Sequence, residues 1–238
     1  MAEFYTRFIK ETFDESGRLI DCSYEYDESF NYGYDVIDPL GELYPDRLAM
    51  LWRNDRGEEA RLTFGDVKRL STQAANCFAA RGLKKGDALM AVLRTHWEYW
   101  VVAVAAHKLG LLLSPVYYRF TADELAYRME KANVKAVVTC REGGAAENVL
   151  AAAKKTGVGI TFALGGGEGF EDFHAAIASQ PETMARVATR TDEPMLVYFT
   201  SGTTGQPKAV LHNQAFPLAN HYGSRYMQDV HDGSLHFA

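Results

Sequence analysis

Residues 88–116 read ALMAVLRTHWEYWVVAVAAHKLGLLLSPV, and they contain two short apolar runs on either side of a longer apolar stretch. The run 88–93 has the length of a buried strand, and the stretch 97–109 has the length of a helix that Gly110 would end. The run 111–116 predicts a second strand. A strand, a helix and a strand in succession need a crossover connection, which is right-handed and makes the two strands parallel. These residues therefore predict the α/β fold class.

The residues upstream predict a hairpin that leads into a helix. Two short strand-like runs separated by RGEE fit a β-hairpin over 49–64. Thr63 and Asp66 have the spacing of a capping box, and apolar residues then recur at helical spacing until Gly82. Residues 1–47 are rich in Tyr, Asp and Glu without a helical or alternating period, so we expect an irregular leader with room for one short helix.

Strands and helices also alternate downstream. Thr121 and Glu124 form a second capping-box pattern, and a strand, a helix over 145–155 and a further strand follow. This alternation predicts one mostly parallel sheet with helices on both faces. We assign residues 48–238 to this α/β region and interpret GGGEG at 165–169 as a loop within it.

The composition excludes several classes of function. The 238 residues are 47% hydrophobic and 24% charged, which is typical of a globular protein. A net charge of -6 without a basic cluster argues against a nucleic-acid partner. His107, Lys108 and Pro115 interrupt the longest apolar stretches, so we expect no membrane span.

The cysteines indicate the redox environment. Cys22, Cys77 and Cys140 are odd in number, widely spaced and free of any CxxC pair, which favours a reducing compartment. The N-terminal residues mix acids and bases and do not resemble a secretory signal. We therefore expect a cytoplasmic location, while the oligomeric state stays open.

A second informative stretch is MLVYFTSGTTGQPKAVLHN, residues 195–213, in which a polar loop lies between two short strands. The loop residues are Thr200, Ser201, Gly202, Thr203, Thr204, Gly205, Gln206, Pro207 and Lys208. Its glycines let backbone N–H groups approach an anion, its hydroxyls can donate hydrogen bonds, and Lys208 supplies positive charge. The loop therefore predicts a binding site for the phosphates of ATP.

The loop also has to be compared with a Walker phosphate loop and with a plain hairpin turn. The Walker pattern does not fit, because Lys208 is followed by Ala209 instead of a hydroxyl residue that could bind Mg²⁺. A plain hairpin turn also gathers Ser, Thr and Gly, and composition alone does not separate it from a phosphate loop.

The order Thr-Ser-Gly-Thr-Thr-Gly-x-Pro-Lys behind a strand closely resembles the signature loop of the adenylate-forming superfamily, which includes acyl-CoA synthetases, luciferases and peptide-synthetase adenylation domains. The similarity extends over residues 30–238. The residues before the first predicted hairpin and the turn GLKKGD at 82–87 are most similar to the acetyl and medium-chain acyl-CoA synthetase branch. The resemblance implies that this chain is part of the large N-terminal domain of such an enzyme.

The resemblance also implies a reaction. In that family a carboxylic acid attacks the α-phosphorus of ATP, which gives an acyl-adenylate and pyrophosphate, and coenzyme A then displaces AMP. It implies ATP-phosphate binding by residues 200–208 and a catalytic role for Lys208. The expected small molecules are a short- or medium-chain acid, ATP with Mg²⁺, and coenzyme A.

Several parts of the family pattern are absent from these residues. The chain has no Tyr-Gly-x-Thr-Glu segment and no late catalytic lysine, so we expect it to be inactive alone. A nucleotide-sensing module without turnover and adenylation of another acceptor stay open as alternatives.

The histidines after the loop do not form a metal-ligand pattern. His212, His221, His231 and His236 match no ligand spacing, so we expect no metal-ligating residues. For His212 we leave open a place in the nucleotide or acyl site and a purely structural role.

Overall fold

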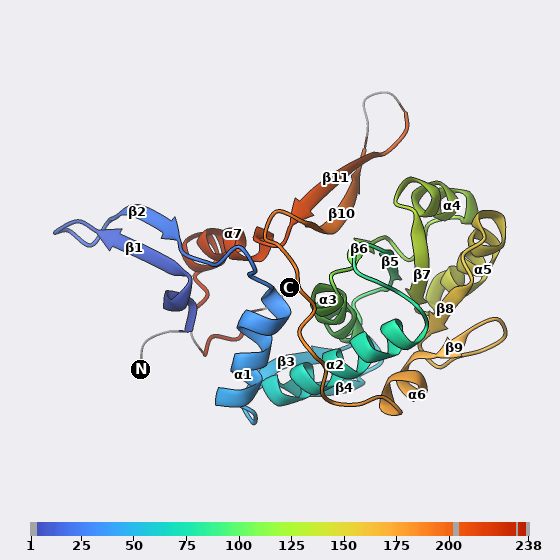
Figure 1. Ribbon diagram of the computed structural model, residues 1–238, viewed down its shortest axis with the longest axis horizontal. Helices are drawn as coiled ribbons and strands as arrows, with labels where there is room; N and C mark the ends of the chain where they lie inside the picture. Colours follow the sequence, from blue (N-terminus) through green and yellow to red (C-terminus); the bar gives the residue numbers. More distant parts are fainter. Residues whose placement is uncertain (1–3, 202–204, 232, 237–238) are drawn as a thin grey trace.

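The computed structural model describes residues 4–201, 205–231 and 233–236 (Figure 1). The elements of the first half are η1 Phe4–Arg7, β1 Ile9–Phe13, β2 Leu19–Tyr24, η2 Gly33–Ile37, α1 Asp38–Leu43, β3 Leu48–Arg53, β4 Glu59–Thr63, α2 Phe64–Ala80, β5 Ala88–Val92, α3 Glu98–Leu109 and β6 Leu112–Pro115. Those of the second half are α4 Ala122–Lys131, β7 Val134–Thr139, η3 Glu142–Gly144, α5 Ala145–Thr156, β8 Ile160–Ala163, β9 Glu171–Asp172, α6 Phe173–Ala178, β10 Pro194–Thr200, β11 Lys208–Asn213, α7 Phe216–Tyr222 and η4 Gly223–Met227.

The main sheet confirms the predicted α/β class. Within the described residues it has seven strands in the order β11-β10-β6-β5-β7-β8-β9. All neighbours are parallel except β10 and β11, which pair antiparallel. The short β9 is an addition that the sequence did not predict.

Strand β5 shows why the sheet has helices on both faces. All five of its residues are buried, because successive side chains point to opposite faces and each face is covered. Leu89 and Ala91 pack in one apolar core with α2, α3 and α6. Met90 and Val92 pack in a second core with α4 and α5. A continuous apolar run is therefore what this position in a parallel sheet requires.

The order of the strands places the helices. The chain passes from β5 through α3 to β6 on one side, and then through α4 to β7 on the other side of β5. Because crossovers of one hand that run in opposite directions lie on opposite faces, α3 and α4 cover different faces of the sheet. The strand order therefore reverses between β5 and β7.

The helix boundaries follow the predicted signals. Thr63 and Asp66 exchange both hydrogen bonds of a capping box at the start of α2. Thr121 and Glu124 do the same at the start of α4. Helix α3 ends at Gly110, which adopts a left-handed conformation with φ +68°.

The N-terminal segment contains more regular structure than the sequence predicted. Strands β1 and β2 form a separate antiparallel hairpin, and α1 follows it. Most side chains of this hairpin are exposed, so it has no buried face and no apolar alternation that would reveal it. The predicted hairpin over 49–64 is confirmed as β3 and β4. The division of the chain near residue 48 stays a prediction.

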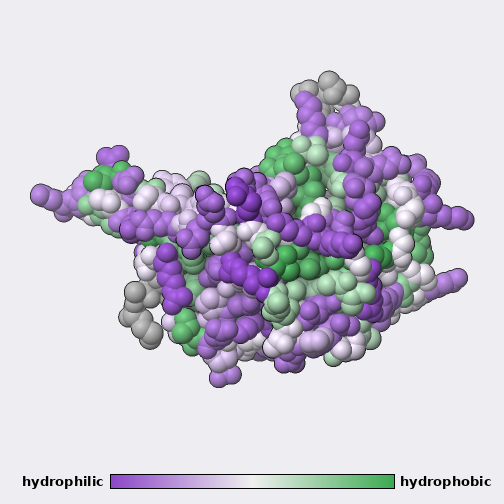
Figure 2. Space-filling view, in the orientation of Figure 1, coloured by the Kyte–Doolittle hydropathy of each residue, from purple (hydrophilic) through white to green (hydrophobic). Residues whose placement is uncertain are grey.

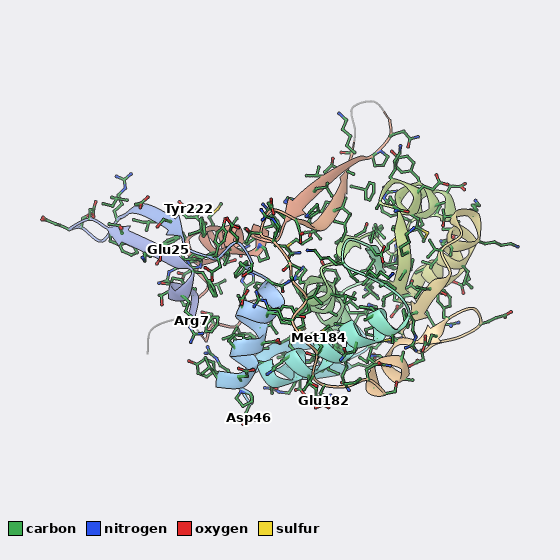
Figure 3. All side chains as sticks on the ribbon, in the orientation of Figure 1. Arg7, Glu25, Asp46, Glu182, Met184 and Tyr222 are labelled. Atoms are coloured by element: carbon green, nitrogen blue, oxygen red, sulfur yellow. The ribbon has the colours of Figure 1, made fainter. Side chains whose placement is uncertain are left out.

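The linker between α6 and β10 returns along α2. Asn76 of α2 donates hydrogen bonds from its side-chain nitrogen to the carbonyl oxygens of Pro181 and Thr183, at 2.8 and 3.0 Å. Met184 packs against the core, and Figure 3 shows it beside Glu182 on this linker. These contacts hold the segment that leads into β10.

Among the residues that the structure describes, no helix has both the length and the apolar character needed to cross a bilayer. Helix α3 is highly apolar, but most of its residues pack within the core of the protein.

Candidate nucleotide-binding site

The predicted phosphate loop connects β10 to β11, and this hairpin projects from the body of the molecule (Figure 1). The two strands pair antiparallel from Pro194 with Asn213 to Thr200 with Lys208. The Oγ1 of Thr200 lies 3.5 Å from the carbonyl oxygen of Lys208. The first and last residues of the predicted site therefore lie opposite each other where the hairpin opens.

The other predicted residues lie around this opening. Ser201 and Gln206 are exposed, and Gly205 has a left-handed conformation with φ +92° that favours glycine. Pro207 is partly buried, and Lys208 is exposed at the start of β11. The predicted residues Gly202, Thr203 and Thr204 lie outside the described residues.

Helix α4 contacts the end of the loop. The hydroxyl of Tyr127 donates a hydrogen bond to the carbonyl oxygen of Pro207 at 3.0 Å. Neither the capping box nor the helical spacing of α4 predicted this contact, because both describe the helix alone. Tyr127 is therefore a residue next to the candidate site that the sequence did not predict.

A second contact from α4 lies next to the first. The guanidinium of Arg128 is 3.9 Å from the ring centre of Phe120 and 5.6 Å from that of Phe199 in β10. Arg128 is buried, and it donates a hydrogen bond to the carbonyl oxygen of Glu124 at 2.8 Å. Burial lowers the pKa of Arg128, against the opposing effect of Glu124. The strand and the loop end are thus both packed against one helix.

The loop follows the carboxyl end of β10, which runs parallel to β6 and, through β6, to β5. In open α/β sheets, ligands bind outside the carboxyl ends of the parallel strands. The loop therefore occupies the edge of the sheet at which this architecture binds small molecules.

A cavity lies beside β11. It has a volume of about 650 Å³ and is lined by residues of the N-terminal segment, β11 and α7, among them Tyr26, Leu211, His212, Phe216 and Leu218. The ring of His212 lies 4.0 Å from that of Phe216. His212 therefore lines this cavity together with Phe216.

The surface near this hairpin is partly apolar. Val210 and Leu211 of β11 are exposed, and Figure 2 shows a hydrophobic area near the base of the projecting hairpin. Tyr222 of α7 is also exposed, and it lies on the side of the molecule where the N-terminal hairpin lies (Figure 3).

Comparison with known proteins decides the family. Residues 41–238 match the family described as AMP-binding enzyme. The chain belongs to this family. The match includes the whole β10–β11 loop, so the resemblance noted from the loop residues is confirmed at the level of the family.

Curated relatives of this family member are acyl-CoA synthetases. The chain is 29% identical over 211 residues to the acyl-coenzyme A synthetase ACSM4, mitochondrial, of Mus musculus. This alignment covers 85% of this chain and 36% of that protein. It is 32% identical over 194 residues to the acyl-coenzyme A synthetase ACSM5, mitochondrial, of Rattus norvegicus, which covers 79% and 34%. The chain thus spans about a third of the length of these relatives.

A solved structure has the same fold. The acyl-CoA synthetase of Brucella canis superposes with a TM-score of 0.73 at 22% sequence identity, over 84% of this chain and 36% of that chain. The predicted architecture, a mostly parallel sheet within an acyl-CoA synthetase fold, is therefore confirmed.

The predicted cytoplasmic location is contradicted by these relatives, whose names describe them as mitochondrial. The prediction was based on free cysteines and on the lack of a secretory signal. Both observations argue against an oxidising or secreted environment, and neither distinguishes the cytoplasm from the inside of an organelle.

Proposed function

We propose that this chain supplies the ATP-phosphate loop of an AMP-forming ligase, which activates a carboxylic acid as an acyl-adenylate and transfers it to coenzyme A. The observation that carries the proposal is the placement of Thr200 and Lys208. These two residues pair with each other at the base of a glycine-containing loop. The loop lies at the carboxyl edge of a parallel sheet, in a chain of the AMP-binding enzyme family.

The chemistry follows from charge. Attack of a carboxylate on the α-phosphorus needs stabilisation of the negative charge that develops on the phosphate oxygens. In our proposal Lys208 contributes a positive charge, and the hydroxyls of Thr200 and Ser201 donate hydrogen bonds. The oxygen atoms of these two hydroxyls are of the kind that Mg²⁺ prefers, so the site fits nucleotide with its metal. Mg²⁺ on the ATP phosphates would neutralise part of their charge.

We further propose that the cavity beside β11 accepts the acyl group of a short- or medium-chain acid. Its volume of about 650 Å³ is in the usual range of small-molecule sites. Leu211, Phe216 and Leu218 give it apolar surface, beside the polar side chains of Asp192 and Asn213. The names of the relatives also favour a mitochondrial location for this protein.

Replacement of Lys208 tests the proposed function. In the protein extended to its natural end, Lys208→Ala should lower acid-dependent ATP–pyrophosphate exchange by roughly 10²- to 10³-fold, the usual effect of losing one charge-stabilising group. Lys208 is exposed, so its loss should leave the free energy of unfolding within about 0.5 kcal/mol. Lys10→Ala is the matched control, because Lys10 is an exposed lysine of the N-terminal hairpin.

The two variants distinguish the alternatives. Unchanged exchange in Lys208→Ala would remove the catalytic assignment. Stabilisation by ATP in a natural-length protein that shows no exchange with any acid would instead support nucleotide sensing. Exchange without formation of a coenzyme A thioester would indicate another acceptor.

A further inference from the structure

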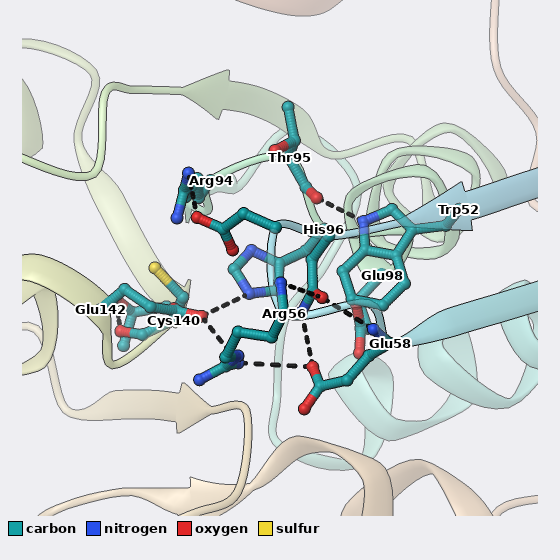
Figure 4. Close-up of polar contacts among 12 residues, drawn as sticks. Trp52, Arg56, Glu58, Arg94, Thr95, His96, Glu98, Cys140 and Glu142 are labelled. Carbon is teal, nitrogen blue, oxygen red and sulfur yellow. Dashed lines mark hydrogen bonds and ion pairs between the residues drawn. The ribbon is translucent and has the colours of Figure 1, made fainter.

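Three side chains with metal-ligating atoms meet between β5 and β7. His96 follows β5, and Cys140 and Glu142 follow β7. One donor atom from each residue lies within 4.8 Å of the other two. The Nε2 of His96 is 3.2 Å from the Oε1 of Glu142. Figure 4 shows the three side chains converging from two loops.

This cluster lies between β5 and β7, where the strand order of the sheet reverses. The chain leaves β5 for β6 on one side, and β7 lies on the other side of β5. The loops that follow β5 and β7 therefore diverge, and open α/β sheets bind ligands in such a crevice. From the spacing of neighbouring strands, the cluster lies roughly 12 Å along the sheet edge from β10.

Packing holds two of the three donors in place. Cys140 is fully buried, and the side chain of His96 is 13% exposed. The indole of Trp52 stacks on His96 at 6.4 Å with an interplanar angle of 21°, and its Nε1 donates to the carbonyl oxygen of Thr95. The Glu142 side chain is one-third exposed, so it has room to adjust.

We propose that His96, Cys140 and Glu142 bind a divalent cation of the zinc class, with water in the remaining position. Imidazole nitrogen, thiolate sulfur and carboxylate oxygen are the donors that zinc takes in proteins. Bonds of about 2.0–2.3 Å in a tetrahedron place donors roughly 3.3–3.8 Å apart. The His96–Glu142 pair, at 3.2 Å, is already close to that spacing, and no donor pair in the cluster is more than 4.8 Å apart.

The charged side chains around the cluster allow Glu142 to exchange its contact with Arg56 for a bound cation. Arg56 lies 3.9 Å from the Oε1 of Glu142, but its side chain is 65% exposed and also pairs with Glu58. Arg56 can therefore turn to Glu58 and solvent when a cation takes its place. Arg94 is already paired with Asp55 at 3.2 Å.

Binding requires the Cys140 thiol to lose its proton to solvent as the metal–sulfur bond forms. Burial and the neighbouring Glu142 carboxylate raise the pKa of this thiol, whereas the backbone N–H groups of Arg94 and Glu142 lower it. A bound cation would also lower the pKa of this thiol, because it stabilises the thiolate. N–H groups directed at a ligating sulfur are the surroundings that such a site needs.

Cobalt is a suitable probe, because it takes zinc sites and reports thiolate ligation in its absorption spectrum. We expect metal-free protein, titrated with Co²⁺, to develop a thiolate-to-cobalt charge-transfer band that saturates at one equivalent and disappears when Zn²⁺ is added. Cys140→Ser should abolish the band, and Cys22→Ser, which alters a cysteine far from the cluster, should keep it. Absence of the band in the unaltered protein would overturn the proposal, as would its loss in Cys22→Ser alone.

Two further variants keep the proposal testable if Cys140→Ser fails to fold, since that sulfur is buried. His96→Gln and Glu142→Gln change less buried side chains. Each should weaken Co²⁺ binding by more than the roughly 10- to 100-fold lost when a group that only hydrogen-bonds to a metal ligand is removed. Equal Co²⁺ affinity in both variants and the unaltered protein would show that the cluster is an ion-pair network and no metal site.

Discussion

Strands β5 and β10 belong to the same sheet, but their side chains have different surroundings. Every residue of β5 is buried, and helices cover it from both faces. In β10 burial ends after Val197, and the strand continues through exposed Tyr198 to exposed Thr200. The strand that leads to the proposed chemistry therefore leaves the packed body before its last residues.

This difference separates two tasks of the fold. The packing around β5 fixes the position of the sheet edge, and in the proposed function the hairpin presents backbone and hydroxyl groups to a ligand beyond that edge. Substitutions in the body should therefore alter stability, whereas substitutions at the hairpin should alter activity. The following predictions test this separation, from the largest expected effect to the smallest.

The largest effect is expected from Lys108→Met in the body. The Nζ of this fully buried lysine lies 2.6 Å from the Oδ1 of Asp38 and donates to the Oγ1 of Thr72 at 2.8 Å. Removing one partner leaves the other charge uncompensated, so we expect the free energy of unfolding to fall by about 3–5 kcal/mol. Urea unfolding followed by circular dichroism measures this change.

Lys10→Met is the control for that experiment. Lys10 pairs with Glu25 on the N-terminal hairpin, where both side chains are more than half exposed, so its loss should cost less than about 1 kcal/mol. Adding Asp38→Asn to Lys108→Met should recover part of the lost stability. Equal costs for Lys108→Met and Lys10→Met would contradict the distinction between body and surface.

The second effect concerns pH and His107 of α3. Burial lowers the pKa of this imidazole from 6.5 to about 4 in the folded protein. Between these values the unfolded chain binds a proton that the folded protein does not, so stability present above pH 6.5 is lost as the pH falls to about 4. The loss attributable to His107 should reach up to about 3 kcal/mol. The difference between unaltered protein and His107→Gln, unfolded at pH 7.5 and pH 4.5, measures it.

His174 provides the opposite case. Its hydrogen bond to Glu98 raises the pKa of His174, so its contribution is present at low pH and is lost as the pH rises through the raised value. His174→Gln should therefore destabilise the protein more at low pH than at high pH. The hypothesis of a buried neutral His107 is wrong if both histidine variants change stability with the same pH trend.

The sequence predicted most of the body because its signals are local. The capping boxes of α2 and α4 and the apolar run of β5 each involve neighbouring residues, and all were confirmed. The hairpin of β1 and β2 has few buried side chains and left no periodic signal. The order of the loop residues indicated the family without any structure.

Contacts between residues far apart in the chain could not be predicted from the sequence. Tyr127 and Pro207 are 80 positions apart, and His96 and Glu142 are 46 apart. Such pairs depend on strand order and on which face each helix covers, and a single sequence gives neither. The first pair joins a helix to the end of a loop, and the second joins the loops that follow β5 and β7.

The smallest effect is expected from Tyr127→Phe, where the body meets the hairpin. This change removes the hydrogen bond to the carbonyl oxygen of Pro207, which contributes about 0.5–1.5 kcal/mol. If the bond positions the end of the phosphate loop, kcat/KM for ATP should fall by up to about tenfold, while KM for the acid stays the same.

Tyr117→Phe is the matched control, because Tyr117 lies just before α4 and its side chain is exposed. A purely structural role of Tyr127 would lower the unfolding midpoint and leave the kinetics of the folded enzyme unchanged. A positioning role would do the reverse, with a stable enzyme that uses ATP less efficiently. Equal changes in the kinetics for ATP and for the acid would mean that α4 supports the whole site and not the loop alone. The end of the loop at Pro207 would then belong to the packed body of the protein and not to the hairpin.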